Sequence, residues 1–354
     1  MTYKEAEQNC IFQFVSGSHA YGTATENSDR DIRGVFFAPI TSAFDLFHGA
    51  RIFTGEIRDL VTVALRQARD NQLSESITSL EQVLNTESGD LQLNVSTVHN
   101  PHADEELQEV RKFLKLATDC NPNIIEFLYV EQGILRTSNV WEKIRANRAA
   151  FMSRLARFRF SGYAIAQLRK MDSHRQYLRN PPKDKPRLSA YGIDSQMLLS
   201  EAQLKNIKTL PKEVLKPKIV NSLDAMTDYW GAVQQWRGYQ VYLQTRNPAR
   251  AELEAKMGFD GKHASHLIRL MRMAREILVT GEVQVHRPDA KELLAIRQGE
   301  WTYEECVQHA QEIESSLEAL YLTSPLPCKP DYNTISNLYV ELCEERYGIK
   351  LKKS

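Results

Sequence analysis

One stretch near the N-terminus, from Ile11 to Pro39, constrains this chain more than any other. It reads IFQFVSGSHAYGTATENSDRDIRGVFFAP, an apolar run, a glycine turn and a second apolar run that carries two aspartates. Apolar runs of this length bounded by turn residues are typical of buried strands. We therefore expect a strand at 11–15, a turn at 16–18, one or two helical turns at 19–24 and a second strand at 29–38.

The second predicted strand places two carboxylates side by side. Side chains alternate between the faces of a strand, so we expect Asp29, Asp31 and Arg33 on one face and Gly34 on the other. Like charges at such close range resist ionising together unless a cation neutralises them, and a divalent ion that carries a phosphate-bearing substrate is the usual solution. The pair predicts a metal site.

The glycine turn supplies a complementary feature. Gly17 has no side chain, so backbone N–H groups of the Gly17-Ser18 turn are able to approach a phosphate, and the start of the following helix adds partial positive charge. An isolated Asp-x-Asp is common on solvated faces. The turn and the acid pair together predict that metal and phosphate meet here.

The complete motif is more specific than either part. Gly17-Ser18, nine intervening residues and then S-D-x-D-x-R-G on an apolar strand resemble the signature of the DNA polymerase β-type nucleotidyltransferase superfamily. Within it, the run resembles the branch of stand-alone bacterial and phage predicted nucleotidyltransferases. The resemblance continues over 111–128, 258–271 and 280–301, whereas about 50–102 and about 189–246 match poorly.

The apolar periodicity changes from strand-like to helix-like near residue 105. We expect an α/β (α+β) protein, with a small mixed-sheet nucleotidyltransferase domain at 1–115 and a mostly helical domain at 116–354. The segment RNPPKDKPR at 179–187 predicts a linker because paired prolines oppose helix and charge favours water. A hairpin is expected around 282–287.

Composition narrows the protein class. The chain has 354 residues, 42% hydrophobic and 25% charged residues and no net charge, which disfavours a globally basic nucleic-acid binder. Its five cysteines are widely spaced and form no C-x-x-C motif, which fits a reducing compartment. No signal-peptide pattern and no apolar run of the roughly 20 residues that span a bilayer are present, so a cytoplasmic protein without membrane association is expected.

The resemblance also implies a third acid from a later strand. Asp104 falls where members of the family carry an acid, counted back from the Arg111 segment. Its surroundings, HNPHADEELQEV, are polar and predict a loop that leads into a helix N-terminus, where acidic residues simply compensate the helix dipole. Asp104 is the expected third metal ligand, with Glu106 and Glu56 as alternatives.

Basic residues occur at two further places. Asp260 is the expected N-cap of a helix that begins near Lys262. In that helix Lys262, His266 and Arg269 recur at helical spacing and lie on one stripe. These residues either contact a triphosphate, orient the acceptor or form a solvated face. The segment 169–187 has seven Lys or Arg against two Asp and is either a solvated linker or a grip on a polynucleotide backbone.

These features together predict an enzyme. We expect a Mg²⁺-dependent or Mn²⁺-dependent nucleotidyltransferase that moves an NMP from an NTP such as ATP to an acceptor hydroxyl, an RNA 3′ end or a protein side chain, with release of pyrophosphate. Asp29, Asp31 and Asp104 would bind metal, and Gly17 and Ser18 would hold the β- and γ-phosphates. Arg33 would either pair with Asp31 or meet phosphate. The alternative is a non-catalytic nucleotide-binding or RNA-binding module, such as a toxin–antitoxin-type regulator, with the same fold.

Overall fold

The structure, a computed structural model, describes residues 3–26, 28–39, 97–99, 104–207, 209, 217–246 and 248–348. Within it the chain divides into two compact units. Unit 1 consists of 1–160, 272–290 and 316–354, and unit 2 consists of 161–271 and 291–315. The sequence instead predicts two continuous domains that meet near residue 115. Whether these domains fold independently stays a prediction.

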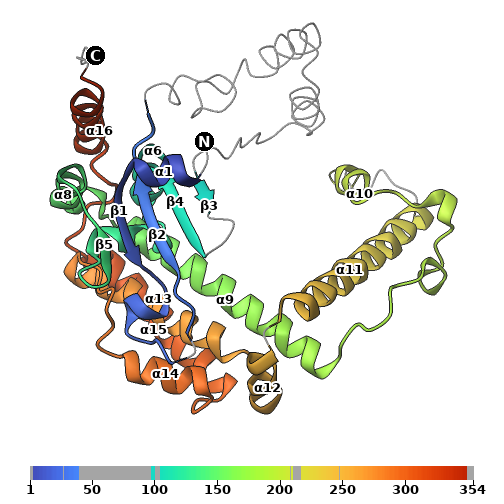
Figure 1. The fold of residues 1–354 in the computed structure, drawn as a ribbon. Helices are drawn as coiled ribbons and strands as arrows, with labels where there is room; N and C mark the ends of the chain where they lie inside the picture. The colour runs from blue at the N-terminus through green and yellow to red at the C-terminus, as the bar shows by residue number, and fades with distance from the viewer. Residues whose placement is uncertain are drawn as a thin grey trace, which may run out of the picture. The chain divides into compact units, whose positions relative to one another are not determined.

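Unit 1 is built on a mixed five-stranded sheet in the order β3-β4-β2-β1-β5 (Figure 1). Strand β1 pairs antiparallel with β2 and with β5, β4 pairs antiparallel with β3, and β2 pairs parallel with β4. The expected mixed sheet is confirmed. The strands are β1 (Cys10–Val15), β2 (Ile32–Phe36), β3 (Thr97–His99), β4 (Glu105–Glu109) and β5 (Ile134–Arg136).

Two expected boundaries in this region are wrong. The second strand begins at Ile32 rather than at residue 29, so Asp29 and Asp31 precede it. Residues 105–109 form β4 rather than a loop or a helix start, and the helix that follows begins at Val110, where the Glu109 side chain accepts hydrogen bonds from the backbone N–H groups of the first turn.

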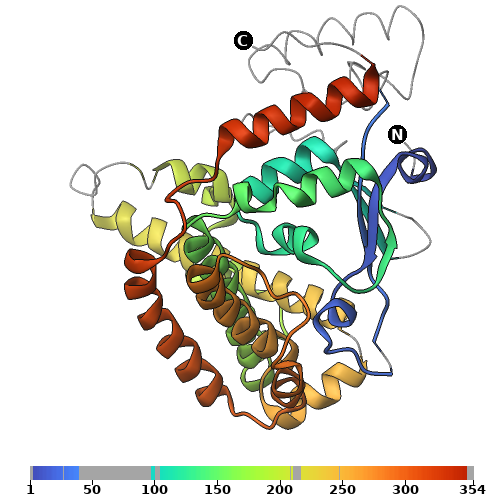
Figure 2. The ribbon, with the colours of Figure 1, turned by 90° about the vertical axis from the view of Figure 1, so that its left-hand side faces the viewer.

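Aromatic side chains fill the core of unit 1. The rings of Phe12 and Trp141 stack with centroids 4.0 Å apart, and Phe113 packs against Trp141 at 5.3 Å. Phe14 meets Phe127 edge to face at 4.8 Å. Phe12 and Phe14 lie on one face of β1. That face is covered by helices α6 (Val110–Thr118) and α8 (Asn139–Ala146) and by the 3₁₀ turn η1 (Glu126–Tyr129). Helix α16 packs beside α6 (Figure 2).

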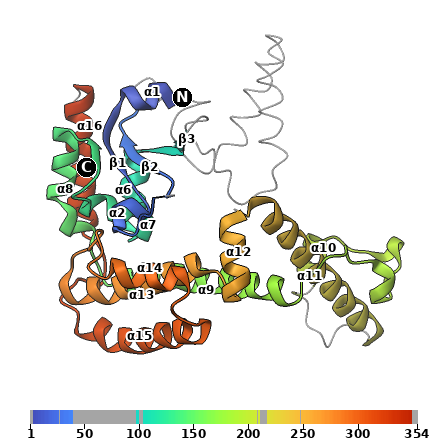
Figure 3. The same ribbon diagram turned by 60° about the horizontal axis from the view of Figure 1, so that its bottom comes forward.

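The rest of the chain is mostly helical, as the sequence predicts. Helices α9, α13 and α15 contribute residues to both units. In unit 2, α10 packs on α11 (Figure 3). The helices and 3₁₀ turns are α1 (Tyr3–Gln8), α2 (Ser18–Tyr21), α6 (Val110–Thr118), α7 (Pro122–Ile125), η1 (Glu126–Tyr129), α8 (Asn139–Ala146), η2 (Arg148–Phe151), α9 (Leu155–Arg179), η3 (Leu188–Tyr191), η4 (Ser195–Met197), α10 (Glu201–Ile207), α11 (Pro217–Thr245), α12 (Pro248–Met257), α13 (Gly261–Thr280), α14 (Ala290–Gln298), α15 (Tyr303–Thr323) and α16 (Tyr332–Tyr347).

Two further expectations have clear outcomes. The proline-rich segment is confirmed as a break, because α9 ends at Arg179 and no helix or strand occupies 180–187. The hairpin at 282–287 is wrong. Val283, Val285 and Arg287 are buried while their neighbours are more exposed, so the segment has the alternation of a strand but pairs with no other strand in the described part of the chain.

Candidate active site

The parallel pairing of β2 with β4 brings two of the predicted acids together. Ile32 is paired with Glu105, and the backbone N–H of Ile32 donates to the carbonyl oxygen of Asp104 at 2.9 Å. Asp31 and Asp104 therefore occupy neighbouring positions just before the two strands begin. Their carboxyl groups lie within hydrogen-bonding reach of each other, a contact that requires one of them to be protonated. Asp31 is half-buried, whereas Asp29 and Asp104 are exposed.

The electrostatics of Asp31 reflect this crowding. Burial, the hydrogen bond with Asp104 and the negative charge of Asp104 raise the pKa of Asp31 to about 6, and the charge of Asp29 adds to the effect. The guanidinium of Arg33 opposes the rise but does not cancel it. A carboxyl group that resists ionisation beside other acids is what a divalent-cation site looks like before the cation is bound. Asp31 and Asp104 form a pair of possible ligands, but among the described residues the three acids do not form a group whose ligand atoms all lie within 4.8 Å of one another.

Arg33 is engaged by acids of the neighbouring strand. Its guanidinium lies 3.2 Å from Glu106 and 3.5 Å from Asp104, and Glu106 also accepts from the Gln108 side-chain amide at 3.1 Å. Arg33 therefore places positive charge beside both Asp104 and Glu106. Of the two alternatives for the third acid, Glu106 is bound in this ion pair, and Glu56 lies outside the described residues.

The glycine turn lies directly against Asp31. Ser16 donates its backbone N–H to the carbonyl oxygen of Asp31 at 2.8 Å, which joins the end of β1 to the acid segment. Gly17 has φ 66° and ψ −139°, a backbone conformation that is nearly restricted to glycine. A Cβ atom added to Gly17 would lie 2.8 Å from Oδ2 of Asp31. The helix that follows, α2, is shorter than expected and begins at Ser18.

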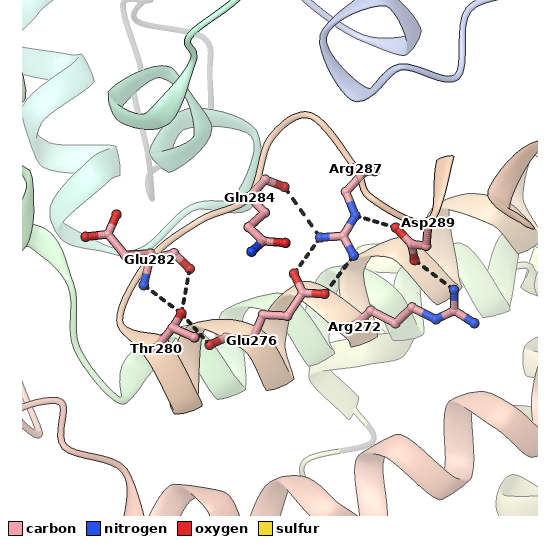
Figure 4. Close-up of polar contacts among 7 residues, drawn as sticks. All are labelled: Arg272, Glu276, Thr280, Glu282, Gln284, Arg287 and Asp289. Carbon is pink, nitrogen blue, oxygen red and sulfur yellow. Dashed lines mark hydrogen bonds and ion pairs between the residues drawn. The ribbon is translucent and has the colours of Figure 1, made fainter. Parts of the chain in front are cut away.

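A buried charge cluster, which sequence analysis did not single out, holds the far end of this turn. Arg287 is only 2% exposed, and its guanidinium donates to both carboxylate oxygens of Glu276 and to Asp289, which also pairs with Arg272 at 2.7 Å (Figure 4). The backbone N–H of Arg287 donates to the carbonyl oxygen of Tyr21 at 3.1 Å. The cluster therefore ties the segment 284–289 to the end of α2.

Close packing at Gly22 supports the same connection. Gly22 has φ 74°, and a Cβ atom there would lie 2.8 Å from Nε2 of His286. Tyr21 is buried and donates its hydroxyl to Glu126 at 2.7 Å, so it packs and anchors the turn. The motif HRPD at 286–289 could have been found from its arginine and aspartate two residues apart, directly after the alternating segment 282–285.

The basic residues of α13 belong to unit 2. Asp260 caps the helix, since its Oδ1 accepts from the backbone N–H groups of Lys262 and His263. Arg269 is 3% exposed, so the stripe is not a solvated face. Burial and the positive charges of Arg269 and Lys262 hold the pKa of His266 well below its usual range, so His266 is neutral at pH 7. Their role stays a prediction.

Comparison with known proteins places this geometry in a family. Residues 2–188, which include the glycine turn and all three acids, match the RNA repair pathway DNA polymerase beta family. The chain belongs to this family. Membership in the RNA repair pathway DNA polymerase beta family identifies the chain as a polymerase β-like nucleotidyltransferase at the level of the family.

A second comparison extends over most of the chain. The chain is 22% identical over 327 residues to an uncharacterized 38.9 kDa protein in the nrdC-mobD intergenic region of Enterobacteria phage T4. The match covers 86% of this chain and 87% of the phage protein. No solved structure matches. Among the described residues, no helix has the length and apolar character that crossing a membrane requires.

The conformation of Gly17 generates a first prediction. Gly17→Ala is expected to destabilise the protein by about 1–3 kcal/mol, because its backbone is strained for any side chain and the new Cβ meets Asp31. It also displaces the Asp31 carboxylate, so NTP affinity in a calorimetric titration should fall. The matched control is Gly192→Ala, which has φ 64° but no atom within 4 Å. Equal effects of the two substitutions on nucleotide affinity would contradict the assignment.

The raised pKa of Asp31 generates a second prediction, which concerns the dependence of stability on pH. A carboxyl group whose pKa rises from 3.8 to about 6 on folding stabilises the fold below about pH 4, and that contribution is lost as the pH rises through 6. Without divalent ions, Asp31→Asn should therefore become more stable relative to the wild type between pH 4 and pH 7. Mg²⁺ or Mn²⁺ should raise the melting temperature of the wild type more at pH 7.5 than at pH 5. If the difference in melting temperature between Asp31→Asn and the wild type did not change with pH, the neighbours of Asp31 would not raise its pKa.

Proposed function

We propose that the protein is a metal-dependent nucleotidyltransferase that moves an NMP from an NTP to an acceptor hydroxyl with release of pyrophosphate. The observation that carries the proposal is the contact between the carboxyl groups of Asp31 and Asp104 beside the Gly17 turn. Two acids held in contact by the backbone pairing of β2 and β4 are poorly suited to a purely structural role, because each disfavours ionisation of the other.

In this proposal each residue has a defined task. Asp29, Asp31 and Asp104 hold Mg²⁺ or Mn²⁺, which when bound lowers the pKa of the acceptor hydroxyl and neutralises the triphosphate. Arg33 keeps Asp104 oriented through their 3.5 Å ion pair. The backbone of Gly17 and Ser18 receives the phosphates, since the absence of a side chain at Gly17 leaves the backbone open beside Asp31. No side-chain nucleophile or covalent intermediate is required.

The acceptor is proposed to be RNA. The family that the chain belongs to is described by its place in an RNA repair pathway, which favours an RNA 3′ end over a protein side-chain hydroxyl. Attack on the α-phosphorus requires a free hydroxyl, so an RNA with a 3′-phosphate cannot accept an NMP. Incubation with labelled NTPs and two oligoribonucleotides that differ only in this terminal group distinguishes RNA transfer from protein labelling.

Substitution of the acids tests the reaction itself. Asp29→Asn, Asp31→Asn and Asp104→Asn should each reduce transfer below about a tenth of the wild-type rate, a loss of at least about 1.4 kcal/mol of transition-state stabilisation. The Asp31→Asn, Asp104→Asn double variant should be little worse than either single one, because the residues act as a unit. Asp119→Asn, which removes the charge of an acid paired with Arg159, is the control.

Two results would contradict the proposal. Wild-type transfer by Asp31→Asn or Asp104→Asn, with circular dichroism showing native folds for all variants, would remove these acids from the reaction. Nucleotide binding without transfer to any RNA or protein acceptor would instead support the non-catalytic binding module.

Residues of α13 are proposed to contact the triphosphate or the acceptor. Replacement of Lys262 by Ala leaves the backbone N–H that Asp260 caps, so the helix start is retained. The KM for NTP should rise several-fold if Lys262 contacts the triphosphate, and the KM for RNA if it contacts the acceptor. Lys256→Ala, an exposed lysine on α12, is the control. Unchanged KM values for both substrates would remove Lys262 from the site.

A further inference from the structure

Unit 2 contains a second group of metal-ligating side chains, separate in sequence from the acids. His174 lies on α9, Asp260 precedes α13 and His263 lies in its first turn. One ligand atom from each residue lies within 4.8 Å of the other two. Asp260 is fully buried and the two histidines are half-buried. A carboxylate so completely removed from water requires compensation by positive charge or by hydrogen bonds.

The distances within the group match those of a metal centre. Nδ1 of His174 lies 3.0 Å from Oδ2 of Asp260, and Nε2 of His263 lies 3.4 Å from the same oxygen. A tetrahedral Zn²⁺ ion with ligands at about 2.0–2.1 Å separates neighbouring ligand atoms by about 3.3 Å. Two of the three separations are therefore already close to those of a bound ion.

Neighbouring groups orient these ligand atoms. Nδ1 of His263 is 2.8 Å from Oε1 of Gln167, an arrangement in which Nδ1–H donates to the amide oxygen and leaves the lone pair on Nε2. The lone pair on Nε2 of His263 then faces Oδ2 of Asp260, and two electron-rich atoms repel each other at this distance. A cation bound between the two atoms would make the contact favourable. Oδ1 of Asp260 is held by the backbone N–H groups at the start of α13, which leaves Oδ2 directed at the histidines. Ligating histidines typically have such a partner on the other ring nitrogen.

The group is accessible from a cavity. His174 and His263 line a pocket of about 500 Å³ together with Glu254, Arg246 and Tyr242. Glu254 is buried, and its pKa is raised by burial and by the charge of Asp260. It is paired with Arg246 at 3.1 Å and accepts from the Tyr242 hydroxyl at 2.8 Å. The pocket gives an ion a route to the histidines, and Arg169 and Lys170 also line it.

We propose that His174, Asp260 and His263 bind one divalent transition-metal ion, Zn²⁺ in the first instance. Two imidazoles and a carboxylate favour Zn²⁺ over Mg²⁺, which prefers oxygen ligands. The ion joins α9 to the start of α13, and its remaining coordination positions are left to water or to a ligand from the pocket. The proposal does not rest on the nucleotidyltransferase reaction, because its residues and its metal differ from those of the acid site.

Metal retention by the full, untagged chain tests the site. The Asp31→Asn, Asp104→Asn background is used so that the acid site does not compete for the ion. After removal of metal with a chelator, incubation with Zn²⁺ and dialysis, elemental analysis should find about one Zn²⁺ per chain. Co²⁺ in place of Zn²⁺ should give the visible absorption bands of nitrogen and oxygen coordination. Zn²⁺ should also raise the melting temperature.

Variants in the same background separate a metal site from a hydrogen-bond network. His174→Gln and His263→Gln should each lower Zn²⁺ affinity at least about 10-fold, and Gln167→Leu should lower it by a similar factor. Asp260→Asn retains the helix cap but removes the anionic ligand, so it should lower affinity without unfolding the chain. His309→Gln, which alters a histidine of the same unit outside the group, should retain the ion.

Two outcomes would overturn the site. Absence of retained Zn²⁺ in a folded chain would show that the three residues form only a hydrogen-bond network. Equal retention by the His174→Gln, His263→Gln double variant and by His309→Gln would place the ion elsewhere. Circular dichroism on each variant excludes loss of the fold as the cause of a change, and Asp260→Asn keeps the test valid if a histidine variant fails to fold.

Discussion

The parallel pairing of β2 with β4 is the constraint on which the candidate active site depends. Backbone hydrogen bonds fix Ile32 opposite Glu105, and the residues just before them, Asp31 and Asp104, are then forced into contact although 73 positions separate them in the chain. The free energy that holds these carboxyl groups together comes from the sheet and from its aromatic core rather than from the acids themselves. Arg33 offsets part of the repulsion, and the Gly17 turn closes over the same carboxylate.

Much of this arrangement could be predicted from the sequence, and the failures have physical causes. Gly17, Asp29 and Asp31 lie within one local motif, so a local pattern finds them. Asp104 stays a predicted metal ligand, although it lies beside Asp31 as the prediction requires. Strand β4 is missed because its sequence, EELQE, has a single apolar residue. Its acids are used by tertiary partners: Glu105 by the Tyr3 hydroxyl, Glu106 by Arg33 and Glu109 by the first turn of α6. The strand propensity of a segment gives no information about partners contributed by other segments.

The remaining errors have the same origin. Residues 282–287 alternate as a strand does, yet their backbone hydrogen bonds go to the α2 turn through Arg287 rather than to a neighbouring strand. His174 lies in the basic segment 169–187, and its contact with the buried Asp260, which lies 86 residues away in the chain, has no signal in that segment. A pattern of charge in one segment gives no information about a partner contributed by another segment.

The discontinuity of unit 1 determines when, during synthesis, its segments are all available to fold together. The acids and the glycine turn lie within the first 104 residues, but the turn is bonded to Arg287, and α16, which completes the packing around α6, ends at Tyr347. A ribosome therefore exposes the acid motif long before it supplies the residues that fix its geometry. The nascent chain has to keep β1, β2 and their apolar faces from associating with other chains during that interval, and the candidate site is held in place only after the residues of unit 1 as far as Tyr347 have been made.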